Sequence, residues 1–354
     1  MLAVSCGGLI DYRAAGLAQA FDDVRPLLAP LPFTLDTRTD LGSVTKILAT
    51  ATALMALAAA GEVSLEHTLG EILPWTGGAP CASATLTQLL EHRAGLWEWW
   101  PLYLTTLEPD AALRLAAARP LRYPPDDRRH YSDLGFQLLG AVVSHVADRP
   151  LDDAVHELVL APLGLRETRF GRPDRAGPVA ASATGDWIER RMIQTGEPYP
   201  VAGEVDAFTG WRSHVLVGEV NDGNAFHALG SVAGHAGLFS TARDLLHFGD
   251  ALLRCLAGAG EIPAATVRRF LTPGGDPAQG LGFRRWETSA GEAWGHTGFP
   301  GVAVAIVPAL DATVAMITNR LHVTGSPRST EPMWQLALRA ACEHCGAFPG
   351  ERAT

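Results

Sequence analysis

Lys46 is the only lysine among the 28 basic residues of this chain of 354 residues, and Ser43 precedes it by three positions. Residues three apart on a helix share a face, so the two side chains can meet. A serine hydroxyl is a weak nucleophile that needs a base. Arginine stays protonated, whereas a lysine can act as a base if its surroundings lower its pKa. The spacing predicts a serine nucleophile activated by Lys46; the alternative is an ordinary surface lysine on a helix.

A second group with possible chemistry is Tyr131-Ser132-Asp133, at the start of a predicted helix. The Tyr131 phenol could carry a proton between a nucleophile and a leaving group. In the alternative reading, Ser132 or Asp133 only caps the helix and Tyr131 packs against its neighbours.

A third group is His296-Thr297-Gly298, at the end of a predicted strand. Glycine on an edge strand lets a ligand approach the backbone, and a histidine beside a hydroxyl could bind a substrate carboxylate or assist proton transfer. The alternative is a structural histidine.

Together and in this order, the three groups resemble the signature of penicillin-recognising serine hydrolases. The nearest pattern is that of class C β-lactamases, D-alanyl-D-alanine peptidases and related esterases. LLEHRAGL at 89–96, APLGL at 161–165 and GHAGLFSTARD at 234–244 are also similar to stretches of that family. The resemblance runs from about residue 3 to residue 339. It implies an α/β fold of the β-lactamase/DD-peptidase type, an antiparallel sheet flanked by helices.

The resemblance also implies roles for individual residues. Ser43 would be the acylated nucleophile, and Lys46 would either accept its proton or keep Tyr131 anionic. Tyr131 would pass the proton to the leaving group and then activate the deacylating water. The backbone N–H groups of Ser43 and Phe299 would form the oxyanion hole. No metal or organic cofactor is expected.

Two departures from the family pattern bear on the substrate. Asp133 stands where the family more often has asparagine, and an anion there would raise the pKa of Lys46 and disfavour a substrate carboxylate. His296 replaces the lysine of class C β-lactamases, as in some D-Ala-D-Ala peptidases, D-aminopeptidases and esterases. With Thr297 and Gly298, it is expected to contact substrate, and its recognition of a carboxylate should weaken as pH rises.

Two further groups are candidates for the cleft. Trp97, with Trp99 and Trp100, follows the turn at 94–96 and would line an acyl pocket; the alternative is packing within the helical part of the chain. His235 follows the loop GEVNDGNA at 218–225, which resembles GxVHDENA in a subgroup of cell-wall hydrolases. It would face the cleft, or else only pack in its turn.

Strands are expected near both ends of the chain, with helices between them. The patterns predict a hairpin at 3–12, helices at 44–60, 134–146, 151–160, 241–256 and 332–342, and strands at 293–296, 302–307 and 313–318. Residues 171–224 resemble long loops. We therefore expect a discontinuous α/β domain of residues 1–68 and 226–354, with a mostly helical domain inserted at 69–225.

Composition sets limits on partners and location. A net charge of −10 makes a nucleic-acid surface improbable. The apolar run at 47–60 is too short for a membrane span. The start of the chain has no export signal, so a cytoplasmic protein is expected, or a periplasmic or secreted one if the N-terminus has been trimmed. Five scattered cysteines indicate free thiols in a reducing compartment, with Cys342 and Cys345 at a helix end rather than in a metal site.

The sequence thus predicts a serine hydrolase that works through an acyl-enzyme on a small molecule or short peptide. We expect a small ester or a D-amino-acid peptide or amide as substrate. The alternatives are a β-lactamase that hydrolyses β-lactam antibiotics and a penicillin-binding protein-like binder with little turnover.

Overall fold

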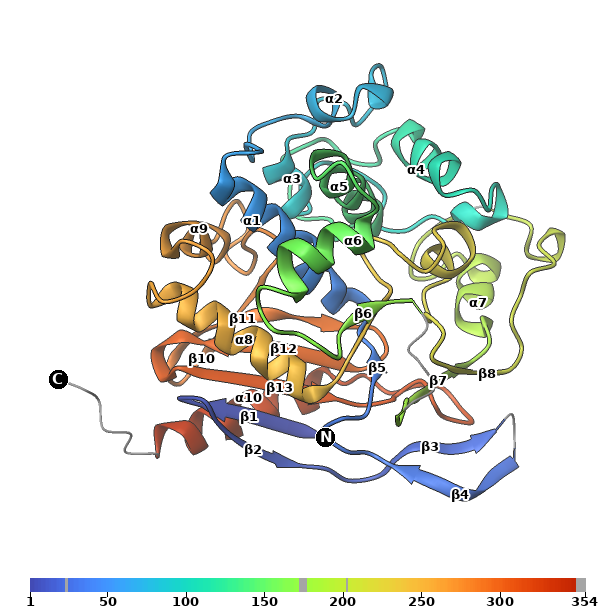
Figure 1. The fold of residues 1–354 in the computed structure, drawn as a ribbon. Helices are drawn as coiled ribbons and strands as arrows, with labels where there is room; N and C mark the ends of the chain where they lie inside the picture. The colour runs from blue at the N-terminus through green and yellow to red at the C-terminus, as the bar shows by residue number, and fades with distance from the viewer. Residues whose placement is uncertain (23–24, 172–176, 202, 348–354) are drawn as a thin grey trace.

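A computed structural model describes residues 1–22, 25–171, 177–201 and 203–347. Its main sheet is antiparallel and six-stranded, in the order β10-β11-β12-β13-β1-β2 (Figure 1). The strands come from both ends of the chain: β1 (Leu2–Cys6), β2 (Leu9–Arg13), β10 (Arg284–Thr288), β11 (Gly291–Gly298), β12 (Val302–Val307) and β13 (Ala312–Ile317). The predicted N-terminal hairpin and the three C-terminal strands are therefore present and lie in one sheet.

Both faces of this sheet are covered because its strands alternate apolar side chains toward each face. On β12, Val302, Val304 and Ile306 belong to the large core under α8 (Ala242–Leu256). The alternate residues of β12 belong to a second core with Trp334 of α10 (Glu331–Gly346). The sheet is thus the middle layer between α8 and α10 (Figure 1).

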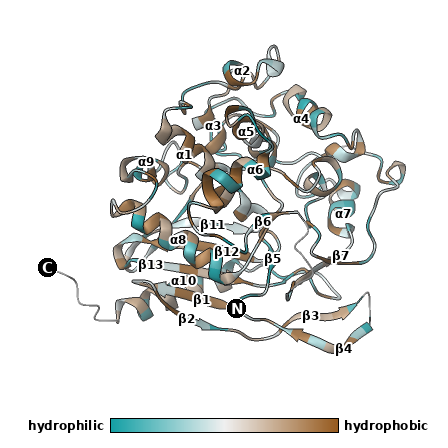
Figure 2. Cartoon of the chain, in the orientation of Figure 1, coloured by the Kyte–Doolittle hydropathy of each residue, from teal (hydrophilic) through white to brown (hydrophobic). Residues whose placement is uncertain are grey.

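The segment that carries Ser43 is a composite helix. It begins with a 3-10 turn (Gly42–Val44), continues as a π-helix (Lys46–Ala51) and ends as α1 (Thr52–Ala60), where Gly61 adopts a left-handed φ of 78°. By length and apolarity alone, Gly42–Ala60 could cross a bilayer, but 72% of that window is buried inside the protein. Figure 2 shows its hydrophobic colouring where it runs through the core.

The remaining helices of the described chain gather beyond the end of the sheet (Figure 1). They are α2 (Leu69–Ile72), α3 (Leu86–Leu90), α4 (Pro109–Ala118), α5 (Asp133–Val146), α6 (Leu151–Val155) and α7 (Trp187–Thr195), with α9 (Ala264–Phe270) beside α8. Smaller sheets pair β3 (Leu17–Asp22) with β4 (Arg25–Pro32), β7 (Ala181–Thr184) with β8 (Val215–Val217), and β5 (Thr39–Asp40) and β6 (Arg169–Phe170) with β9 (Leu238–Ser240). The domain boundaries at 68/69 and 225/226 stay a prediction.

Two sequence-based expectations are corrected. Residues 171–224 are not only loops, because the described part contains α7, β7 and β8. The cysteines are not all free: Cys6 of β1 and Cys345 of α10 form a disulfide with their Cα atoms 5.6 Å apart, and Cys81, Cys255 and Cys342 are buried thiols. Cys345 is therefore committed to Cys6, and the Cys342–Cys345 pair is not a metal site.

Candidate active site

Lys46 lies under Ser43 with every proton of its ammonium group engaged. Its Nζ donates to Ser43 Oγ (2.9 Å), to Asp133 Oδ1 (2.7 Å) and to the backbone carbonyl of His235 (3.3 Å). The Lys46 side chain is fully buried, whereas Ser43 is partly accessible. The expected contact between Ser43 and Lys46 is present, and Lys46 is not a surface residue.

Two loops hold this arrangement from outside the composite helix. Asp40 accepts from the N–H groups of Gly42 (2.8 Å) and Asn221 (2.7 Å), which fixes the turn before the nucleophile to the loop around residue 221. Thr50 Oγ1 donates to the carbonyl of Gly234 (2.6 Å), which places the neighbouring His235 carbonyl on Lys46.

Tyr131 and Asp133 reach the site from the start of α5. Ser132 caps that helix, since its Oγ accepts from the Gly135 N–H at 3.1 Å. Lys46 Nζ lies 4.9 Å from the centroid of the Tyr131 ring. Capping of the helix and contact with Lys46 were alternatives in the sequence. In the structure Ser132 caps the helix, while its neighbours Tyr131 and Asp133 contact Lys46.

The protonation of these groups follows from burial and from Asp133. Burial alone would lower the pKa of Lys46, but the charge of Asp133 and contact with Tyr131 raise it above its ordinary value. Burial raises the pKa of Tyr131, although Lys46 opposes this. At neutral pH, therefore, Lys46 is an ammonium ion and Tyr131 a neutral phenol. The expected effect of an anion at position 133 on Lys46 is present.

The segments that carry the two amides proposed for the oxyanion hole lie against each other, where β11 meets the turn before the composite helix. A Cβ added to Gly298 would lie 2.2 Å from the Leu41 carbonyl oxygen and 3.6 Å from the Ser43 nitrogen. A Cβ added to Gly42 would lie 3.3 Å from the Phe299 nitrogen. Glycine at 298 is what permits this close approach of the two segments.

The histidine of the strand motif is not placed as expected. His296 is buried, its Nδ1 lies 2.7 Å from the Thr297 carbonyl oxygen, and burial and then Lys46 lower its pKa to about 3. Thr297 Oγ1 accepts from Arg284 at 3.4 Å. A buried neutral ring offers no charge, so this placement gives no support to His296 as a carboxylate-binding residue.

Ser43 opens into a cavity of about 340 Å³. Carboxylates dominate its polar lining, and none of its described lining residues is a lysine or arginine. The acids are Asp40, Asp133, Asp186, Glu189 and Asp222, and other lining residues include Trp99, Tyr131, Ile188, Met192, Tyr199, Phe299 and Pro300. His296, Thr297 and Gly298 are not among the described lining residues.

Trp97 and His235 also lie outside the described lining. Trp97 donates from Nε1 to the Pro120 carbonyl (3.0 Å) and packs edge-on against Trp100. Of the three candidate tryptophans, Trp99 is the one among the described lining residues. His235 is buried, and its Nε2 lies 3.0 Å from Asp222 Oδ1. It therefore supports a lining carboxylate rather than facing the cavity itself.

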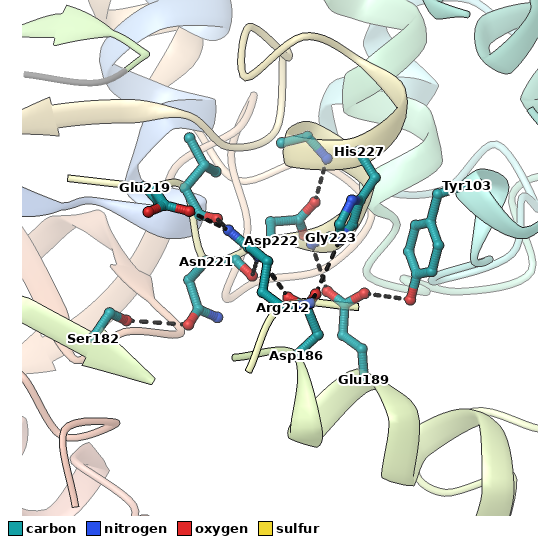
Figure 3. Close-up of polar contacts among 12 residues, drawn as sticks. Tyr103, Ser182, Asp186, Glu189, Arg212, Glu219, Asn221, Asp222, Gly223 and His227 are labelled. Atoms are coloured by element: carbon teal, nitrogen blue, oxygen red, sulfur yellow. Dashed lines mark hydrogen bonds and ion pairs between the residues drawn. The ribbon is translucent and has the colours of Figure 1, made fainter. Parts of the chain in front are cut away.

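Part of the cavity lining belongs to a polar network around the start of α7 (Figure 3). Arg212 donates to Asp186 Oδ1 at 2.6 and 2.9 Å. Although burial would raise the pKa of Asp186, its contacts with His227 and Arg212 lower it to about 2. Glu189 accepts from the Tyr103 hydroxyl (2.6 Å) and from the Gly223 N–H (2.7 Å). Burial and the nearby Asp222 raise the pKa of Glu189 to about 8.

Three lining acids, Asp40, Glu189 and Asp222, have no ion pair with a described lysine or arginine, and Asp222 is paired with His235 instead. Although burial opposes it, the His235 ring and the Ala225 N–H hold the pKa of Asp222 below its ordinary value. Atoms of Asp133, Asp222 and His235 lie within 4.8 Å of one another and could in principle ligate a metal ion. Asp133 already receives the Lys46 ammonium, so a cation there would be repelled by Lys46.

Comparisons with known proteins identify the family of the chain. The profile of the Beta-lactamase family matches residues 2–338, and the chain belongs to that family. An Escherichia coli K12 protein named "Putative D-alanyl-D-alanine carboxypeptidase" is 28% identical over 91% of this chain and 78% of its own length. A Bacillus subtilis N-acetylmuramyl-L-alanine amidase is 28% identical over 91% and 77%.

Solved structures show the same fold. The crystal structure of SurE, which has also been solved with D-Leu, is 25% identical with a TM-score of 0.69 and covers 100% of this chain and 74% of its own. A class C β-lactamase from Rhodobacter sphaeroides is 20% identical with a TM-score of 0.66, covering 98% and 94%. The fold is that of β-lactamases and DD-peptidases, as the sequence predicted.

Proposed function

We propose that this protein is a serine hydrolase that forms an acyl-enzyme on Ser43 and acts on small D-amino-acid peptides, amides or esters. The observation that carries the proposal is the contact of Ser43 Oγ with the buried Lys46 at the base of the cavity. A protein that only bound ligands would have no need of this contact or of Tyr131 beside it.

The proposed reaction starts with a proton transfer inside the site. Lys46 must lose a proton before it can act as a base, and Asp133 Oδ1 at 2.7 Å is an acceptor within reach. Neutral Lys46 then takes the Ser43 proton as Oγ attacks the carbonyl carbon, and the N–H groups of Ser43 and Phe299 hold the oxyanion. Tyr131 protonates the leaving group and recovers its proton from Lys46. Water repeats the sequence in the second half-reaction.

The charge of the cavity supports a substrate with an ammonium group. Lys46 balances Asp133 and Arg212 balances Asp186, which leaves Asp40, Asp222 and the weakly acidic Glu189 without an ion pair to a described lysine or arginine. An ammonium group beside Asp222 would find a charge-assisted acceptor. The D-amino acid preference rests on similarity to relatives, among them SurE, which has been solved with D-Leu.

A substrate panel tests the proposal. It contains nitrophenyl esters of D-alanine and L-alanine, their N-acetyl forms, a D-Ala-D-Ala peptide, a D-amino-acid amide and nitrocefin, with Ser43→Ala as the control. We expect fastest turnover of the D-configured substrates with a free amino group. No fluorophosphonate label on Ser43 would refute the serine hydrolase, a persistent penicillin label without turnover would favour the binder, and efficient nitrocefin hydrolysis would favour the β-lactamase.

A further inference from the structure

His92 accepts hydrogen bonds from the backbone of both residues that flank Tyr131. The carbonyl oxygen of His92 accepts from the His130 N–H at 2.8 Å, and its ring Nδ1 accepts from the Ser132 N–H at 3.0 Å. His92 itself lies in the turn after α3 with a φ of +58°. This left-handed conformation is uncommon outside glycine, and it is what turns one residue's carbonyl and side chain toward the same segment.

The His92 ring also packs against Tyr131. The centroids of the His92 and Tyr131 rings are 4.5 Å apart, and those of the His92 and Phe136 rings are 5.1 Å apart. His92 is 2% exposed, and its Nε2 has no hydrogen-bond partner among the described residues. The side chain therefore fixes both the backbone of Tyr131 and the face of its ring.

The hydrogen bond at Nδ1 defines the form of the imidazole. Because Nδ1 accepts from an N–H, it carries no proton, so the proton of the neutral ring is on Nε2. Burial and the charge of Lys46 hold the pKa of His92 well below its ordinary value, which keeps this form at neutral pH. A second proton on Nδ1 would abolish the bond to Ser132.

We propose that His92 is a positioning residue that sets the place of the Tyr131 hydroxyl over Ser43 and Lys46. This inference rests on the proposed role of Tyr131 in proton transfer. His92 contacts neither Ser43 nor Lys46 through any hydrogen bond of the described chain, so it acts through Tyr131. The competing explanation is a histidine that only fills the core.

Two substitutions separate the hydrogen bond from the ring. His92→Asn keeps an acceptor near Nδ1 and tolerates positive φ, whereas His92→Phe keeps an aromatic ring without an acceptor. We expect H92F to lower kcat by about 10- to 100-fold with KM nearly unchanged, since small displacements of a catalytic group have effects of this order. H92N should recover most of kcat. His145→Phe, at an exposed position of α5, is the control and should match wild type.

A double-mutant cycle with Tyr131→Phe tests whether His92 acts through Tyr131. In that background, H92F should cause no further loss of kcat. Independent losses in the two variants, or equal loss in H92N and H92F, would overturn the proposal; so would a lowered Tm with wild-type kcat. Fluorophosphonate labelling of Ser43 in wild type tests the proposed function separately.

If H92F does not fold, the proposal can still be tested on the wild-type protein through the tautomer of His92. Nitrogen chemical shifts of the histidine rings report the tautomer directly. We expect His92 to be the neutral Nε2–H form at pH 6 to 8, as the accepting Nδ1 requires. A protonated Nδ1 in that range would remove the hydrogen bond on which the proposal depends and would overturn it.

Discussion

Replacing Asp133 with asparagine should convert a pH-independent reaction into a pH-dependent one. In the proposed mechanism, Lys46 passes a proton to Asp133 across 2.7 Å, so neutral Lys46 would form without loss of a proton to solvent. In the D133N variant this acceptor is gone, and Lys46 must release its proton to water. Burial alone would lower the pKa of Lys46, and in the variant the charge of Asp133 no longer opposes it. The pKa of Lys46 therefore falls.

The size of the effect follows from the distance. Two unit charges 2.7 Å apart attract by about 6 kcal/mol at an effective dielectric constant of 20, before solvent screening. One pKa unit corresponds to about 1.36 kcal/mol, so even a fraction of this attraction moves the pKa of Lys46 visibly. Because base catalysis contributes on the order of 10²- to 10⁴-fold, we expect kcat/KM of D133N to fall about 100-fold at pH 7 and to recover as pH rises toward 10.

The assay is the pH profile of kcat/KM with a nitrophenyl ester. Wild type should be level around neutrality, whereas D133N should rise with pH. Asp36→Asn, which removes an exposed carboxylate paired with Arg243, is the control and should follow wild type. A D133N profile parallel to wild type would show that Lys46 is not the base and would refute the reasoning.

The same substitution has a stability effect with a defined sign. Since the folded pKa of Lys46 lies above its unfolded value, the contribution of the pair is fully present below the unfolded pKa of lysine. It is lost only as pH rises through the folded pKa. In D133N the folded pKa of Lys46 falls, so burying its charge costs stability until the group deprotonates. Urea unfolding should therefore show D133N destabilised by about 1–3 kcal/mol at pH 7 and by less at pH 9.

Three further predictions concern the base, the substrate charge and the cysteines. Lys46→Arg should abolish acylation in a folded protein, because arginine cannot release its proton; a normal burst of nitrophenol would contradict this. Asp222→Asn should lower kcat/KM about 10-fold for an amino ester relative to its N-acetyl form, as expected for loss of a charge-assisted bond; an unchanged ratio would place the ammonium group elsewhere. Denatured, unreduced protein should show only three reactive thiols, and reduction of Cys6–Cys345, which closes a loop of 339 residues, should cost up to about 5 kcal/mol in urea unfolding; five thiols would exclude the bond.

The reactive centre was accessible from sequence because its parts are local. Ser43 and Lys46 share one helix at a spacing that brings them together, and Tyr131 and Asp133 start another. What sequence could not supply was the relation between these helices, which depends on tertiary contacts such as Thr50 with Gly234.

The part of the cavity lining formed by α7 could not be predicted from the sequence for a related reason. Asp186 and Glu189 belong to the start of α7, whose sequence WIERRMIQT is polar and lies between segments rich in glycine and proline. With only Ile193 fully buried, the helix has too little apolar periodicity to be distinguished from a loop. The polar residues at its start were the available signal, and their meaning depends on Arg212 and Tyr103 from distant segments.

The disulfide shows the same limit at the longest range. An odd number of scattered cysteines indicated free thiols, but the pairing of β1 with β13 brings the start of the chain beside α10. Cys6 and Cys345 become neighbours only through this arrangement, since 339 positions separate them. Spacing along the chain therefore could not identify the pair.

The buried state of His296 bears on how the proposed mechanism would work with a single lysine. In the family pattern with a second lysine, two cations would share the surroundings of the tyrosine. Here the His296 ring lies 5.8 Å from the Tyr131 ring and is neutral because burial and Lys46 hold its pKa at about 3. Lys46 is thus the only cation in contact with Tyr131 among the described residues, and Asp133 neutralises it. The Lys46–Asp133 ion pair has no net charge, so in the proposed mechanism it can pass one proton at a time without adding charge to the buried site. An asparagine at 133 or an arginine at 46 would remove this proton transfer.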